Sequence, residues 1–216
     1  MKLYKFRKLI TQEDFYRLKN IVETGCFWFS DFWELNDPME GIFYAQDLID
    51  IKKVFIQKIN YKICSFSGEK GFNNPAMWGY YADGFCGVAI EIEIDEALIE
   101  RVSYSKIVYS VVLENDHEDE AKKVLVNKLD CWRHEDECRC LVKTDKNFNT
   151  VGEIRAIHFG SPYMNAENKN DFIGSCKRIS NYHVFKNKLK LENRNNINCV
   201  DVHVVKNKVI QNLNDI

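Results

Sequence analysis

Short strand-like segments, which outnumber the helical ones, are the feature that most constrains the fold of this chain. Residues 61–67 read Tyr-Lys-Ile-Cys-Ser-Phe-Ser, and residues 88–94 alternate Val, Ile and Ile with Ala and Glu, the period of two that is typical of a strand. We expect further strands at residues 3–6, 26–30, 102–113, 138–143, 154–159, 183–189 and 200–205. Several neighbouring strands are separated only by short turns. The sequence therefore predicts an α+β fold, with flanking helices on a mixed, largely antiparallel sheet in a single domain.

Helices are expected between these strands. Thr11 and Asp14 begin a helix whose apolar residues recur at helical spacing until Gly25. Asn74 followed by Pro75 begins another, because proline is favoured in the first turn. Further helices are expected at residues 46–58, 117–129 and 166–176.

Composition excludes several classes of protein. The chain of 216 residues has 45% hydrophobic content and three prolines, which fits one globular core. Its apolar runs are far shorter than the roughly 20 residues that span a bilayer, and we expect a cytoplasmic protein with no membrane contact. The eight cysteines are expected to be free thiols. Cys131, His134, Cys138 and Cys140 lack paired Cys-x-x-Cys spacing, so we expect no metal.

Charge is unevenly distributed, although the net charge is only -2. Residues 91–120 carry ten acids against two bases, whereas residues 176–208 carry eight bases against two acids. Two interpretations remain open for the basic part, which includes Lys186, Lys188 and Lys190. It is either a solvated surface or a site for the phosphates of a nucleotide or nucleic acid.

The run Trp-Arg-His-Glu-Asp-Glu-Cys-Arg at residues 132–139 contains the most informative polar residues. If it enters a strand, Glu135, Glu137 and Arg139 share one face. Two carboxylates so close to each other repel. We therefore expect one to hold its proton near neutral pH while the arginine keeps the other ionised. Such a pair can divide acid and base roles. The alternative is a solvated helix end whose acids face water.

Other polar residues lie among aromatic residues and are candidates for lining a cleft that binds a planar ligand. They are Tyr4, Lys5, Asn36, Asp37, Glu40, Ser65, Ser67, Trp78 and Tyr81. Each also has a structural interpretation, as a turn residue, a core residue or a partner across a sheet. No Gly-rich phosphate loop, Gly-x-Ser-x-Gly elbow, His-Glu-x-x-His helix or dinucleotide fingerprint occurs, which excludes the enzyme classes that depend on them.

The order of these motifs resembles a bacterial family known as domain of unknown function 2971. The resemblance rests on Leu-Tyr-Lys-Phe-Arg, Leu-Asn-Asp-Pro-Met-Glu, Cys-Ser-Phe-Ser, Met-Trp-Gly-Tyr-Tyr-Ala-Asp and Trp-x-x-Glu-x-Glu-x-Arg. It covers residues 3–172, and residues 176–216 are expected to pack on that part. The chain departs from the family pattern at His134 and at the Gly84-Phe85 turn.

A second resemblance is to ADP-ribosyltransferase folds, in which a histidine or arginine, a serine or tyrosine, and a glutamate hold NAD. The order of Lys5, Ser65 with Ser67, and Glu135 with Glu137 is similar. The resemblance implies that Glu137 engages the nicotinamide ribose and that Glu135 activates the acceptor. It also implies that Trp78 or Tyr81 stacks on nicotinamide. Tyr4, Lys5, Ser65 and Ser67 are expected to bind the cofactor as well. Lys5 departs from the pattern, and Arg139 is expected to pair with a glutamate.

Two functions follow as hypotheses. The first is an ADP-ribosyltransferase-like enzyme that uses NAD to modify a protein or nucleic acid, as a toxin or phage-defence effector. The second is a non-catalytic nucleotide or nucleic-acid binding protein of the same fold. An unrelated hydrolase and a protein-interaction role also stay open.

Overall fold

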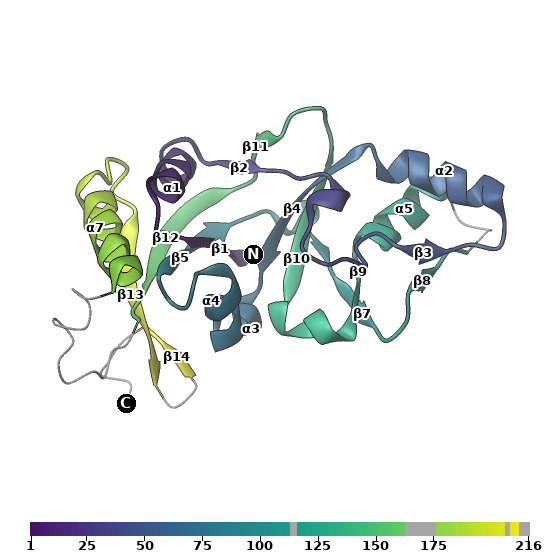
Figure 1. The fold of residues 1–216 in the computed structure, drawn as a ribbon. Coiled ribbons are helices and arrows are strands. Elements are labelled where there is room, and N and C mark those ends of the chain that lie inside the picture. The colour runs from purple at the N-terminus through teal and green to yellow at the C-terminus, as the bar shows by residue number, and fades with distance from the viewer. Residues whose placement is uncertain (113–115, 163–175, 206–207, 212–216) are drawn as a thin grey trace.

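The computed structural model describes residues 1–112, 116–162, 176–205 and 208–211 and is built on one large sheet (Figure 1). Its strands are β1 (Lys2–Lys8), β4 (Tyr61–Ser67), β5 (Gly87–Glu93), β6 (Glu100–Arg101), β10 (Glu137–Lys143), β12 (Glu153–Gly160), β13 (Asn198–Val205) and β14 (Lys208–Ile210). They are ordered β14-β13-β12-β5-β1-β4-β10-β6. Only β12 and β13 pair in parallel, and the other neighbours are antiparallel. The expected α+β class with a mixed, largely antiparallel sheet is confirmed.

Short strand pairs and helices complete the fold. The pairs are β2 (Cys26–Trp28) with β11 (Phe148–Thr150), β3 (Phe43–Tyr44) with β8 (Tyr109–Ser110), and β7 (Ser103–Ser105) with β9 (Asn127–Leu129). The α-helices are α1 (Gln12–Thr24), α2 (Leu48–Lys58), α3 (Glu69–Phe72), α4 (Pro75–Tyr81), α5 (His117–Leu125) and α7 (Lys177–Leu191). The 3-10 helices are η1 (Phe32–Glu34), η2 (Glu96–Leu98) and η3 (Asp130–Glu135).

Helices cover both faces of the sheet. α1 and α7 lie against one face, and α3 and α4 lie against the other (Figure 1). Alternation along β5 explains this, because Val88 and Ile90 join the core under α1 and α7, while Ala89 faces α4. α2 and α5 form a smaller core with β3 and β8 at one end of the molecule.

Helix α1 begins and ends where its sequence signals predicted. The Thr11 side chain accepts a hydrogen bond from Asp14 N, the Asp14 carboxylate accepts from Thr11 N, and Gly25 ends the helix with φ 68°. This capping box satisfies two backbone donors that the first turn would otherwise leave unpaired.

The sheet opens between β1 and β4. These strands pair at one position only, Tyr4 with Ser67, whereas β4 continues along β10 for its whole length. Beyond that position, Ile63 of β4 pairs with Ser30 instead, and Lys5 Nζ donates to Ser65 O at 2.5 Å. The lysine ammonium therefore bonds a carbonyl oxygen that the backbone N–H of a neighbouring strand would normally bond. This leaves a gap in the sheet.

Three expected elements are wrong. Residues 183–189 lie in helix α7 rather than in a strand, because the residues it buries, Ile179, Tyr182, Lys186 and Leu189, follow helical spacing. Of the strand expected at 102–113, residues 102–112 form only the short β7 and β8, and residue 113 lies outside the described residues. The helix expected to reach residue 129 ends at Leu125, and the chain continues into β9.

The helix expected at 166–176 falls, except for its last residue, outside the described residues. Within the described ranges, no helix combines the length and the apolar character that crossing a membrane requires.

Candidate functional site

A cavity of about 240 Å³ lies at the gap between β1 and β4. The segment around η1 lines one side of it, and α4 and the end of η3 line another. Most of the candidate residues line this cavity: Tyr4, Lys5, Asn36, Glu40, Ser65, Ser67, Tyr81, Glu135, Glu137 and Arg139. The topology therefore brings together residues from five separate parts of the chain.

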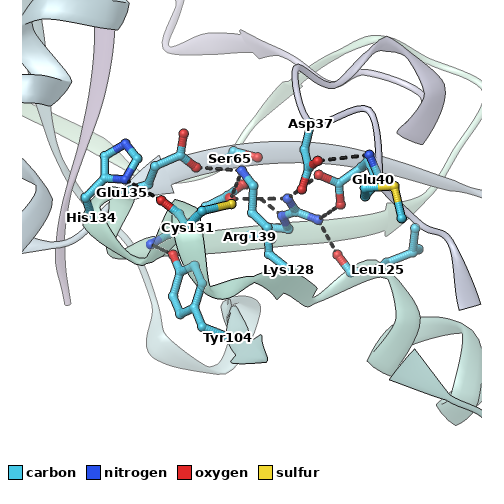
Figure 2. A network of polar contacts seen from close by, with 12 residues as sticks. Asp37, Glu40, Ser65, Tyr104, Leu125, Lys128, Cys131, His134, Glu135 and Arg139 are labelled. Atoms are coloured by element: carbon cyan, nitrogen blue, oxygen red, sulfur yellow. Dashed lines mark hydrogen bonds and ion pairs between the residues drawn. The ribbon is translucent and has the colours of Figure 1, made fainter. Parts of the chain in front are cut away.

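Arg139 is the centre of a buried ion cluster on one side of the cavity (Figure 2). Its Nη1 and Nη2 donate to the two carboxylate oxygens of Glu40 at 2.5 and 2.9 Å. Its Nε and Nη2 donate to Glu137 at 2.8 and 3.2 Å, and Nη1 also donates to Leu125 O. The expected ion pair of Arg139 with Glu135 or Glu137 is present and involves Glu137, and Glu40 is a further partner.

Lys128 links the two glutamates of the motif. Its Nζ lies 2.5 Å from Glu135 Oε2 and 3.0 Å from Glu137 Oε2, and all three side chains are buried. Glu135 and Glu137 do not share a strand face as expected, because Glu135 ends η3 and β10 begins at Glu137. Asp136 between them has φ 47°, and this left-handed turn lets both carboxylates reach the same ammonium.

The cations keep Glu137 ionised. Burial raises the pKa of this carboxyl, but the charges of Arg139 and Lys128 outweigh burial and lower the pKa to about 2. Arg139 therefore keeps one carboxylate of the motif ionised, as expected, and that carboxylate is Glu137. The alternative of a solvated helix end is wrong, because Glu135 and Glu137 are both buried.

Two tyrosines position the glutamates. Tyr81 of α4 donates its hydroxyl hydrogen to Glu135 Oε1, and Asn36 hydrogen-bonds the same tyrosine. Burial, and then the bond to Glu135, raise the pKa of Tyr81, so its hydroxyl stays a donor at neutral pH. The backbone N–H of Glu137 donates to the Tyr104 hydroxyl at 2.8 Å.

Cationic groups of β1 line the cavity as well. Lys5 donates to a carbonyl oxygen, and burial lowers its pKa. Arg7 Nε is buried and has no hydrogen-bond partner in the described part of the chain. A buried guanidinium nitrogen without a partner is costly unless a ligand satisfies it, so this end of the cavity suits an anion.

Two candidate residues lie elsewhere. Trp78 is completely buried in the core between Phe6 and Phe85, and its Nε1 donates to Phe72 O at 2.9 Å. Asp37 is a turn residue whose carboxylate accepts from Met39 N at 2.9 Å. Neither side chain lines the cavity, so stacking of Trp78 on a ligand there does not fit the structure.

Sequence reasoning missed Arg7 and Lys128. Arg7 follows Lys5 by two residues in the same strand, and the alternation of β1 could have identified it. Lys128 stands in a segment that was expected to be helical, and no local signal linked it to the glutamates.

The cysteines and histidine that were weighed as zinc ligands do not converge. Cys138 and Cys140 point into the core, whereas Cys131 is exposed, and His134 Nδ1 lies 2.9 Å from Cys131 O. No group of three His, Cys, Asp or Glu residues suited to a metal occurs within the part of the chain that the structure describes.

Three lysines of the basic C-terminal part, Lys186, Lys188 and Lys190, contact neighbouring residues. Lys186 is buried and lies 2.9 Å from Asp201 Oδ1, which Lys190 also contacts at 3.1 Å. Lys188 lies over the Phe15 ring and reaches Glu192 at 4.0 Å. These contacts support a structural role for α7 more than a surface that binds phosphates.

Comparisons of the chain with protein-family models, with curated proteins and with solved structures gave no match.

Proposed function

We propose that this protein is an ADP-ribosyltransferase-like enzyme that uses NAD to modify a protein or nucleic acid. The observation that carries the proposal is the convergence of Glu137, Ser65 and Lys5 on one cavity from three different strands. We also infer membership in the family of domain of unknown function 2971, on the motifs quoted above.

The chemistry of the cavity supports this assignment. Cleavage of the bond between ribose and nicotinamide develops positive charge on the ribose as the electron pair leaves with nicotinamide. An ionised carboxylate that is already held in place stabilises such charge without reorganisation. Glu137 meets this need, because Arg139 and Lys128 keep it ionised and fixed.

Glu135 has the role of accepting the proton of the attacking acceptor group. Its carboxylate is oriented by Tyr81 on one oxygen and by Lys128 on the other. As the acceptor forms its bond to the ribose carbon, its proton passes to Glu135. Lys128 stabilises the carboxylates of Glu135 and Glu137 together.

The size of the cavity limits which part of NAD it can enclose. Pockets for drug-sized ligands usually have roughly 300–1,000 Å³, whereas this cavity has about 240 Å³. We therefore expect the nicotinamide and its ribose inside, a phosphate near Arg7, and the adenosine outside.

A non-catalytic nucleotide-binding protein is the second candidate. Arg7 favours it, because a guanidinium with a free, buried Nε suits a phosphate whether or not a reaction follows. The ion cluster around Arg139 would then be a structural feature only.

Incubation with labelled NAD and cell lysate separates the two candidates. We expect label transfer by the native chain and at least a hundredfold less by the Glu137→Gln variant, with Glu93→Gln as a control at an exposed position. Circular dichroism must show that each variant is folded. Transfer that survives in Glu137→Gln would refute the assigned role.

Direct binding of NAD by calorimetry completes the test. Arg7→Met should weaken binding at least tenfold, while Lys8→Met, at an exposed neighbour, should leave it unchanged. Binding of NAD without its consumption in the presence of lysate would favour the second candidate, and no binding at all would refute both.

A further inference from the structure

The outer face of helix α2 is apolar and exposed. Its inner face packs Ile51 and Val54 against α5 and so attaches the helix to the smaller core. The outer face carries Leu48, Ile49, Phe55 and Ile56, of which 74%, 59%, 44% and 55% is exposed, and the C-cap residue Ile59, 38% exposed, continues it. Single exposed apolar residues are ordinary, but an apolar stripe on one helix face, interrupted by Lys52, indicates an interaction surface.

The spacing of this stripe is self-complementary. Leu48, Lys52, Phe55 and Ile59 are separated by four, three and four residues, the spacing of a coiled-coil seam. Because this spacing is the same from either end, a second copy of α2 running antiparallel meets it in register. Leu48 then lies opposite Ile59 of the second copy, and Lys52 lies opposite its Phe55.

A cation–π contact favours the same arrangement. Lys52 is exposed and is the one charged residue within the stripe, and the antiparallel register places its ammonium at the aromatic ring of the second copy, a favourable cation–π contact. Antiparallel helices also bring opposite ends of their dipoles together. Ile49 and Ile56 flank the seam, so that each faces the other across the two-fold axis.

We propose that α2 is the surface through which two copies of this chain form a two-fold dimer with antiparallel α2 helices. The interface centres on one helix of 11 residues, which is small beside the roughly 1,200–2,000 Å² of stable interfaces. The dimer is therefore reversible, with a dissociation constant of about 1–100 µM.

Sedimentation equilibrium of the full chain between about 1 and 300 µM tests this proposal. The native mass should rise from the 25.4 kDa of one chain towards twice that value. Leu48→Glu and Lys52→Glu should each raise the dissociation constant at least tenfold. Lys53→Glu is the matched control, because it makes the same charge change at an exposed residue outside the stripe.

A mixing experiment tests the antiparallel register. Leu48→Glu and Ile59→Lys should each weaken the dimer when studied alone. Mixed in equal amounts, they should restore it, because Glu at position 48 then faces Lys at position 59 of the other chain. A parallel pair would place position 48 opposite position 48 and would show no restoration.

Three results would overturn the proposal. They are a native mass of one chain at every concentration, a dimer that Leu48→Glu leaves unchanged, and a dimer that Lys53→Glu weakens as much as Lys52→Glu. A monomer that instead binds vesicles of anionic phospholipid through Leu48 would make this face a membrane-docking surface, which also contradicts a dimer.

Discussion

Replacing Glu137 by glutamine tests the buried ion cluster most directly. The substitution keeps the size of the side chain and removes the charge that Arg139 and Lys128 contact. The pKa of Glu137 is about 2 in the folded protein, against 4.5 for a free carboxyl. A difference of that size corresponds to about 3 kcal/mol of unfolding free energy at pH 7.

The sign of the pH dependence follows from the lowered pKa. The stabilisation by Glu137 is fully present above about pH 4.5 and is lost as the pH falls towards 2, where the folded protein takes up the proton. The difference between the native chain and Glu137→Gln should therefore shrink from about 3 kcal/mol at pH 7 to about 1.4 kcal/mol at pH 3.

Urea unfolding at pH 7, 5, 4 and 3, followed by circular dichroism, measures this difference. Glu93→Gln is the control, because its pair with Arg155 is exposed on both sides and should contribute less than about 1 kcal/mol at any pH. Equal losses in the two variants, or a loss in Glu137→Gln that does not change with pH, would refute the account of the cluster.

Two further substitutions separate the cluster from the core. Lys128→Met leaves Glu135 and Glu137 buried without their shared cation and should lower the unfolding free energy in urea by about 3–5 kcal/mol. Lys122→Met is the control, because its pair with Glu118 is exposed, and should lower it by less than about 0.5 kcal/mol. Trp78→Ala should lower the unfolding free energy measured by thermal unfolding by about 3–5 kcal/mol. It should leave the NAD affinity of the folded protein unchanged, because Trp78 lies outside the cavity. A selective loss of NAD affinity would contradict that placement.

Sequence patterns predicted most of the sheet because its strands follow a simple rule. β4 was expected with its observed bounds, and β5 and β12 within one residue at each end, since buried strands show either clear alternation or short apolar runs. Helix α7 was missed because one of its buried positions holds Lys186, whose ammonium lies over the rings of Phe159 and Tyr182. A lysine that buries its stem hides the apolar period from the sequence.

The candidate site was predictable in its members but not in its geometry. Glu137 and Arg139 could be placed on one face by alternation, and the register confirms it, because they pair with Ser67 and Ser65. The position of Glu135 depends on the left-handed backbone of Asp136, which no residue pattern indicated. Glu40 joins the cluster from a turn 99 residues earlier, a contact that depends on the tertiary fold alone.

The charges around the cavity show why this geometry suits a reaction with a cationic transition state. Glu40, Glu135 and Glu137 meet two cations, Arg139 and Lys128, so the cluster has one negative charge in excess when its acids are ionised. The compensating cations, Lys5 and Arg7, belong to β1 across the gap in the sheet. A ligand between the two sides would meet negative charge at one end and positive charge at the other. In the proposed reaction, the first end would stabilise positive charge that develops on a sugar, and the second would stabilise a phosphate. If the cluster only stabilised the fold, the separation of negative from positive charge across the cavity would have no function. Removing the charge of Arg7 on β1 by Arg7→Met would then leave ligand binding unaffected.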